Sequence, residues 1–415
     1  MAEEEKILGM RAESGRWIFV IAGLLINICL GTIYSWSVFR KPLQSLFDVG
    51  ATESGYPFTV FLGVFAIAML LVSGLMEKWG PRKMSIIGGI LVGLGWILAS
   101  QAKSMGMLTL VYGILGGFGV GMVYGCPVAV AARWFPDKRG IAVGFTVMGF
   151  GLSALITAPV SRALIDAVGP MSTFAYLGVA FIIILVILSL PLRFPAVHGW
   201  KPAGWEPPAH VAAAAVELTP SEMLKTARFY GLWLCYVIGV TAGLMAIAIS
   251  SPVGQEIIKL SAGVAATAVA IFAIFNGIGR PIFGWLTDKL TPRGSAILSF
   301  VIIILASMMM YFGAGEGRTA LFMISFAMLW GCLGGWLAIG PTATGSFFGT
   351  KYYPRNYAIM FLAYGAGAFI GPYISGRIRD MTGSYLSSFV PVTILAVVGI
   401  ILALALMSPP KKKET

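Results

Sequence analysis

Residues 271–293 read IFAIFNGIGRPIFGWLTDKLTPR. An apolar run with one arginine, Arg280, is followed by a short charged turn that contains a second, Arg293. The run belongs to an apolar stretch near residues 261–286, and about 20 such residues are enough to cross a bilayer as a helix. The proline and the basic residues at its end are typical of a short loop between two spans. This segment therefore predicts a membrane-spanning helix with one buried charge.

The rest of the chain follows the same pattern. Of its 415 residues 58% are hydrophobic and 11% are charged, whereas a soluble domain carries about 25% charged residues. This composition excludes a soluble enzyme and predicts an all-α membrane protein with twelve transmembrane helices in two six-helix bundles. The predicted parts are an N-terminal bundle (1–191), a Pro-rich cytoplasmic linker (192–226) and a C-terminal bundle (227–415). The four cysteines lie inside apolar stretches and are interpreted as packing residues.

Three short motifs recur at nearly constant spacing, which indicates that the two bundles are copies of one unit. The turn at 290–293 has a counterpart at 79–82, 211 residues earlier, and the pair Arg228-Phe229 has one at Arg16-Trp17, 212 residues earlier. The loop at 352–354 matches 134–136 at a spacing of 218. Parallel repeats of this kind are the architecture of one large class of transporters, whose binding site lies at the bilayer midplane between the halves.

The basic residues predict the orientation in the membrane. With both termini in the cytoplasm, 20 of the 29 Lys and Arg residues fall on the cytoplasmic side and eight on the outer side, as the positive-inside rule requires. The net charge of +12 is thus explained by topology rather than by a nucleic-acid partner. We predict a multi-pass protein of the cytoplasmic (inner) membrane.

Arg280 is the one basic residue that this count leaves over. It lies inside the eighth predicted span, about 12 Å from Asp288 at 1.5 Å per residue, where a charge costs at least about 2.5–3.5 kcal/mol. No acidic residue lies well inside a predicted span, so a substrate carboxylate is the expected partner of the guanidinium. Asn276 lies one turn earlier on the same face and could bind the second carboxylate oxygen; a tie between helices is the alternative.

Polar and aromatic residues on other predicted spans could complete the site. Tyrosine hydroxyls can close a carboxylate site while the rings face a short carbon chain, although such residues also serve in packing and at the membrane interface. The candidates are Asn27 and Tyr34 in the first span, Tyr124 in the fourth, and Phe361 and Tyr364 in the eleventh.

Several motifs resemble those of the major facilitator superfamily. Residues 77–83 and 284–293 resemble its loop signature, and residues 133–144 and 13–17 look like the fifth-span and first-span signatures of the monocarboxylate transporters. Residues 31–36, 123–125 and 275–281 are similar to the bacterial oxalate:formate antiporter branch. The resemblance implies the major facilitator fold and gating roles for the loop residues Glu77, Arg82, Asp288, Arg293, Lys138 and Arg139.

The resemblance also implies a substrate class. It places Tyr34, Tyr124 and Arg280 on ligand positions of the oxalate:formate antiporters, while the second cation of that family falls at Tyr364. Its tenth-span aromatic cage falls at Leu333 and Leu337. One positive charge beside an apolar wall suits one carboxylate, so a monocarboxylate such as L-lactate or pyruvate is expected.

We therefore predict a secondary active transporter that works by alternating access, is not an enzyme, needs neither cofactor nor metal, and functions as a monomer in the bilayer. Proton-coupled symport is the family expectation. Because Asn276 replaces the acidic residue that eukaryotic monocarboxylate transporters have at this position, the proton is expected to travel with the substrate–Arg280 pair. A proton-independent exchanger is the alternative, and a carboxylate sensor or an anion channel fits less well.

Overall fold

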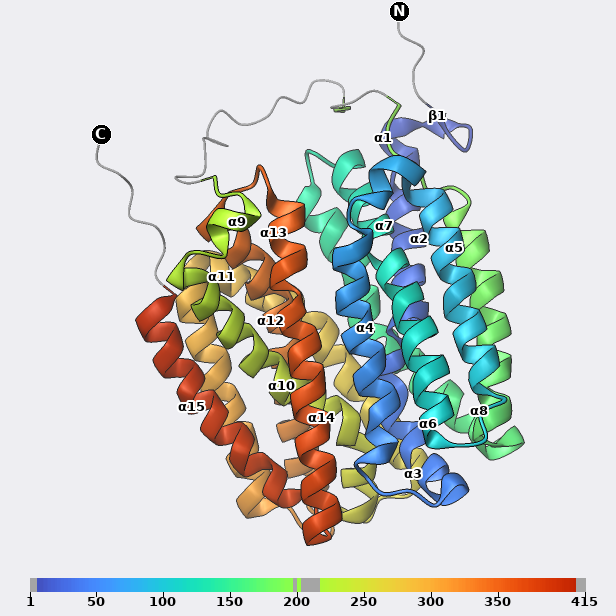
Figure 1. Ribbon diagram of the computed structural model, residues 1–415, viewed down its shortest axis with the longest axis vertical. Helices are drawn as coiled ribbons and strands as arrows, with labels where there is room; N and C mark the ends of the chain where they lie inside the picture. The colour runs from blue at the N-terminus through green and yellow to red at the C-terminus, as the bar shows by residue number, and fades with distance from the viewer. Residues whose placement is uncertain (1–5, 197–199, 203–216, 408–415) are drawn as a thin grey trace, which may run out of the picture.

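The computed structural model describes residues 6–196, 200–202 and 217–407, and these residues are almost entirely helical (Figure 1). A short hairpin that the sequence did not predict, β1 (Lys6–Ile7) and β2 (Met10–Arg11), precedes the helices. The first-half helices are α1 (Ala12–Gly15), α2 (Trp17–Leu30), η1 (Gly31–Ser35), α3 (Trp36–Phe47), η2 (Glu53–Gly55), α4 (Tyr56–Val72), α5 (Leu75–Ala99), α6 (Met105–Leu108), η3 (Thr109–Gly116), α7 (Gly117–Trp134) and α8 (Arg139–Ser189). The second-half helices are α9 (Pro220–Met223), α10 (Ala227–Glu256), α11 (Ala262–Gly313), α12 (Thr319–Phe348), α13 (Tyr353–Met360), α14 (Leu362–Thr382), η4 (Leu386–Ser388) and α15 (Phe389–Leu406).

Within the described ranges, ten helical segments are long and apolar enough to cross a bilayer. Two of them, α8 and α11, have 51 and 52 residues, about twice the length that one crossing needs. Each contains one residue in a non-helical conformation, Gly169 in α8 and Thr291 in α11, followed directly by a proline. Since each of the two can supply two spans, the ten segments accommodate the twelve predicted crossings.

The turns at Gly80 and Thr291 have the same backbone conformation. Gly80 has φ 73° and ψ 162°, and Thr291, 211 positions later, has φ 68° and ψ 160°. Both residues precede a Pro-Arg pair. This agreement supports the prediction that the two turns are repeats, and it places a threonine in a region of φ/ψ space that glycine alone adopts without strain.

We expect the substitution Thr291→Gly to stabilise the protein by about 1 kcal/mol, because it removes backbone strain of about 1–3 kcal/mol at a smaller cost in unfolded-state entropy. The measurement is the thermal unfolding midpoint of the purified protein in detergent, and the reverse change at the equivalent position, Gly80→Thr, is the matched comparison. The midpoint should rise for the first variant and fall for the second. A lower midpoint for Thr291→Gly would contradict the interpretation.

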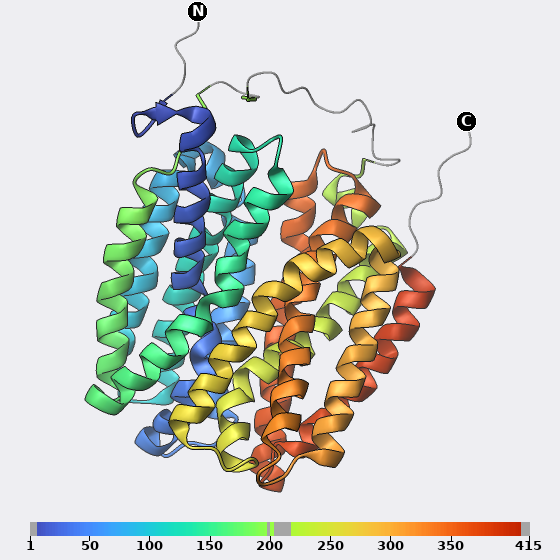
Figure 2. The same cartoon turned by 180° about the vertical axis from the view of Figure 1, so that it is seen from behind.

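The helices form two groups that lie side by side. Helices up to α8 make one group and α10 to α15 make the other (Figures 1 and 2). The hairpin β1–β2 and the last turn of α15 lie at the same end, which we call the terminal end; α3 lies at the opposite, far end (Figure 1). Residues 197–199 and 203–216 of the predicted linker fall outside the described residues, so the boundaries 1–191, 192–226 and 227–415 remain predictions.

The two groups touch near the middle of the molecule and separate toward the terminal end. A Cβ atom added to Gly151 of α8 would lie 2.7 Å from Asn276 Oδ1 and 3.0 Å from the Cα of Gly277, both on α11. About two and three turns further toward the terminal end, Gly144 and Gly140 have no atom within 4 Å of an added Cβ. The same two helices therefore pack tightly at one level and enclose open space at another.

An ion pair fixes the start of the first span at the terminal end. The two terminal nitrogens of Arg16 donate to the two carboxylate oxygens of Asp137 at 2.5 and 2.8 Å, and Nη1 also donates to the carbonyl of Trp134 at 3.0 Å. These hydrogen bonds from Arg16 hold the pKa of the Asp137 carboxyl below its usual range. The pair therefore ties α2 to the loop between α7 and α8.

Candidate functional site

Arg280 is buried in the part of α11 that precedes Thr291, inside the span that the sequence predicts, with 6% of its surface exposed. Its Nη1 donates to the backbone carbonyl of Val147 on α8 at 2.6 Å, and its Nε has no hydrogen-bond partner. Among the described residues, no carboxylate forms an ion pair with it. A guanidinium that keeps an unused donor in an apolar setting can bind an anion that enters from outside.

The Arg280 guanidinium borders a cavity of about 510 Å³ between α8, α11 and α12. Arg280 is the one charged residue among the described residues that line it, and most of the others are apolar, including Val147, Met148, Leu337 and Ala338. This cavity shares four lining residues with a second one of about 920 Å³ that also contains Arg139 and Lys351: Gly140, Val143, Pro341 and Thr342. The two cavities together form a path from the terminal end to Arg280.

Asn276 is fully buried one turn from Arg280, but it contacts helices rather than the cavity. Its Nδ2 donates to the carbonyl of Trp330 on α12 at 3.0 Å, and its Oδ1 has no partner. The contact of Gly151 with this oxygen places the amide where α8, α11 and α12 meet. In this conformation Asn276 ties α11 to α12, which is the alternative role that the sequence left open.

Tyr34 and Tyr364, far apart in the sequence, meet across the two groups of helices. Their hydroxyl oxygens are 2.7 Å apart, and both side chains are buried. The role of these tyrosines as substrate ligands together with Arg280 stays a prediction.

Rings from both groups surround the tyrosine pair. Phe150 packs against Tyr34 with ring centroids 5.1 Å apart, and Phe361 stacks on Tyr364 at 4.9 Å. Tyr124 is 5.6 Å from Phe150 and 6.5 Å from Phe361. The aromatic candidates Tyr34, Tyr124, Phe361 and Tyr364 therefore belong to one cluster of rings.

Two further candidates lie away from the cavity. Asn27 donates to the carbonyl of Gly23 in its own helix at 2.9 Å and packs against Gly149 of α8. Leu333 is buried against Gly243 of α10, whose added Cβ would lie 2.4 Å from it. One turn later in α12, Leu337 lines the Arg280 cavity. Of the two leucines expected to form an apolar wall beside Arg280, Leu337 therefore faces the cavity and Leu333 does not.

The loop residues lie at the terminal end, and two of them take part in the contacts seen there. Glu77 forms an ion pair with Arg133, whose guanidinium also lies 3.7 Å from the ring centroid of Phe194. Arg139 lines the larger cavity. Of the remaining members, Arg82, Lys138 and Asp288 are exposed and Arg293 is half-buried.

Several residues of the site carry no signal in the sequence. The carbonyl of Val147, which binds Arg280, and the carbonyl of Trp330, which binds Asn276, are backbone groups that every residue has. Phe150, whose ring packs against Tyr34, is one of 26 phenylalanines in the sequence, and nothing in its neighbourhood along the chain marks it. Only the helix arrangement selects these groups.

Known proteins share both the sequence pattern and the fold. The model of the Major Facilitator Superfamily matches residues 14–344 and 233–415. The chain is similar to the oxalate:formate antiporter of Oxalobacter formigenes, with 30% identity over 369 residues that cover 89% of this chain and 86% of that protein. It is also similar to human monocarboxylate transporter 11, with 25% identity over 90% of this chain and 79% of that one.

The solved structures agree at the level of the fold. A bacterial homologue of the human lysosomal transporter Spinster, in an inward-facing and unoccupied conformation, has a TM-score of 0.67 and 16% identity. The match covers 94% of this chain and 96% of that one. The predicted fold class and the prediction of a transporter rather than an enzyme are confirmed, and the chain belongs to the Major Facilitator Superfamily.

Proposed function

We propose that this protein carries a short monocarboxylate across the inner membrane by alternating access, with Arg280 as the carboxylate ligand. One observation carries the proposal: a buried guanidinium with an unpartnered Nε borders a cavity that leads to the terminal end, and no described carboxylate pairs with it. An arginine is rarely tolerated inside a membrane span without a functional role.

The chemistry of the cavity supports one carboxylate rather than two. Arg280 provides a single positive charge, and the surrounding side chains of Val147, Met148 and Leu337 are apolar. A second carboxylate would lie against these apolar side chains without a cationic partner, and its loss of hydration would be unfavourable. The name of the human relative, a monocarboxylate transporter, agrees with this choice, and L-lactate and pyruvate are the first substrates to test.

The basic residues favour a cytoplasmic terminal end, so that the path to Arg280 opens to the cytoplasm and the far end faces the outside. This assignment makes the described conformation inward-open. The aromatic cluster around Tyr34 and Tyr364 then separates the site from the outside, and the protein would function as a monomer, since both groups of helices come from one chain.

The proton is proposed to travel with the substrate, because no titratable carboxylate is found among the described residues that line the Arg280 cavity. Exchange of one carboxylate for another is the second candidate. It is favoured by the 30% identity to a protein named an antiporter. Both mechanisms use the same site and differ in how the carrier returns: empty in symport, and loaded with a second carboxylate in exchange.

Uptake of labelled L-lactate into proteoliposomes tests the proposal. We expect saturable uptake that an inward proton gradient accelerates and that pyruvate inhibits more strongly than oxalate. Uptake that does not depend on the proton gradient but rises with unlabelled carboxylate inside the vesicles would establish exchange instead. Binding of lactate without any uptake would indicate a sensor, and uptake that does not saturate would indicate a channel.

A further inference from the structure

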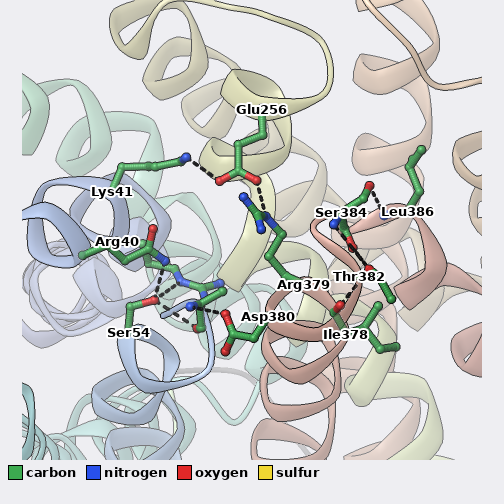
Figure 3. Close-up of polar contacts among 12 residues, drawn as sticks. Arg40, Lys41, Ser54, Glu256, Ile378, Arg379, Asp380, Thr382, Ser384 and Leu386 are labelled. Atoms are coloured by element: carbon green, nitrogen blue, oxygen red, sulfur yellow. Dashed lines mark hydrogen bonds and ion pairs between the residues drawn. The ribbon is translucent and has the colours of Figure 1, made fainter. Parts of the chain in front are cut away.

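The far end of the molecule is closed by polar contacts between the two groups of helices (Figure 3). Asp380, in the last turn of α14, accepts hydrogen bonds from the backbone N–H groups of Ala51 at 2.7 Å and Thr52 at 2.9 Å. The Thr52 hydroxyl donates to the same carboxylate at 2.5 Å. One carboxylate of the second group thus binds three donors of the loop between α3 and α4.

A second set of contacts joins α3 to α10 and α14. Glu256, at the end of α10, accepts from Lys41 of α3 and from Arg379 of α14, whose Nε is 2.5 Å away (Figure 3). Glu256 therefore connects a cation of the first group with a cation of its own group. Separation of the two groups at this end would leave Lys41 without this carboxylate.

Arg40 adds a buried link beneath this layer. It is fully buried and donates through Nε to Ser54 Oγ at 3.1 Å and through Nη1 to the carbonyl of Ala248 on α10 at 3.0 Å. Its Nη2 donates to the carbonyl of Ala51. The loop residue Ala51 is thereby held by Arg40 through its carbonyl and by Asp380 through its amide.

Two glycines allow the chains to come this close. A Cβ added to Gly50 would lie 2.9 Å from Asp380 Oδ1, and one added to Gly376 would lie 2.7 Å from the Cα of Thr52. Real Cβ atoms are essentially never found at such distances. A side chain at either position would therefore push the loop and α14 apart.

We propose that Asp380, Glu256, Arg40 and Lys41 form a latch that holds the far end closed, and that release of Asp380 from Ala51 and Thr52 is the step that opens the site to the other side. The proposal rests on the alternating-access function proposed above. Both carboxylates of the latch lie on the second group, and the amides and cations that they bind across the boundary lie on the first group. Opening must therefore break charged contacts, which sets a barrier between the two conformations.

The variant Asp380→Asn tests the latch, because it keeps the size of the side chain and replaces an acceptor oxygen by an NH₂ donor. All three partners of Asp380 are donors, so the amide cannot satisfy them. Spin labels on Leu46→Cys and Met381→Cys, exposed positions on α3 and α14, report the far-end distance by pulsed electron paramagnetic resonance in nanodiscs. We expect the ratio of open to closed populations to rise about three- to tenfold.

The matched control is Asp48→Asn, at an exposed residue that ends α3 in the left-handed conformation, which asparagine also tolerates. Its distance distribution between the two labels should equal that of the spin-labelled protein without the Asp48 substitution. If Asp380→Asn fails to fold, Thr52→Val removes the hydroxyl donor while keeping the backbone contact and should give a smaller shift in the same direction.

A distribution for Asp380→Asn, or for Thr52→Val in its place, that equals the Asp48→Asn control would overturn the latch. The measurement requires no substrate, so it separates the latch from the proposed function. A changed distance distribution in Asp380→Asn, in a protein that takes up no lactate, would uphold the latch and reject lactate as substrate. Lactate uptake with an unchanged distance distribution would uphold the transport function and reject the latch.

Discussion

Replacement of Arg280 by glutamine is expected to abolish carboxylate uptake and to leave the protein at least as stable as before. Loss of one partner of a desolvated, hydrogen-bonded charge pair costs about 2–5 kcal/mol, which is about 30-fold or more in affinity. The charge of Arg280 has no carboxylate partner among the described residues and its Nε is unpartnered. Removing it should therefore relieve desolvation in the substrate-free protein.

The two readouts separate a ligand from a structural residue. Uptake is measured in proteoliposomes and the unfolding midpoint by thermal denaturation in detergent. Arg40→Gln is the contrasting variant, because Arg40 is also buried but has an acceptor for each of its three nitrogens; its midpoint should fall. The assignment of Arg280 as ligand is wrong if Arg280→Gln lowers the midpoint as Arg40→Gln does, or if it retains near-normal uptake.

Arg280→Lys refines the same test. Lysine keeps the positive charge but offers a single point donor instead of a planar fork. We expect uptake to be lost nearly as completely as with glutamine, because the proposed site would bind the carboxylate through two parallel hydrogen bonds. Substantial uptake by the lysine variant would show that charge alone is sufficient.

The substitution Gly334→Ala is expected to have the second largest effect, on folding as well as on transport. An added Cβ at Gly334 of α12 would lie 2.1 Å from the carbonyl oxygen of Asn276 and 3.3 Å from the backbone nitrogen of Arg280. Both atoms belong to the α11 backbone, so the helices must move apart. Such overpacking costs about 1–3 kcal/mol and displaces the guanidinium from its cavity.

The matched control is Gly331→Ala, one turn earlier in the same helix. Its nearest neighbour is the carbonyl oxygen of Phe275 at 3.7 Å, which is ordinary contact. The yield of folded protein, its unfolding midpoint and lactate uptake should fall for Gly334→Ala and stay near normal for Gly331→Ala. Equal effects of the two variants would show that close packing of α11 on α12 does not position Arg280.

Much of the fold followed from local patterns in the sequence. Apolar stretches of about 20 residues predict spans wherever they occur, and the equivalence of Gly80 and Thr291 was visible as two Pro-Arg turns 211 positions apart. All four cysteines are free and buried, as their apolar context predicted. The continuation of helix to within one residue of the turns in α8 and α11 was not predicted, because proline and charged residues there are equally typical of a longer loop.

The partners within the site were harder to predict. The 2.7 Å contact of Tyr34 with Tyr364 joins residues 330 positions apart. The sequence indicated only the span in which each tyrosine lies. Asn276 shares its face with Arg280 but binds a carbonyl of α12, since a buried amide takes the nearest acceptor. The latch at the far end went unpredicted, because Arg40 and Asp380 look like ordinary charges at span ends.

The sequence by itself determined that this chain crosses a membrane, that its two halves repeat, and that one arginine lies where a charge is costly. These properties are additive along the chain, because the cost of placing each residue in a bilayer depends mainly on its own side chain and its depth. Only the tertiary structure decided which carbonyls bind Arg280 and Asn276, where the cavity opens, and which charges hold the far end closed. Those features depend on distances between helices that are set by glycine contacts and by the packing of both halves together.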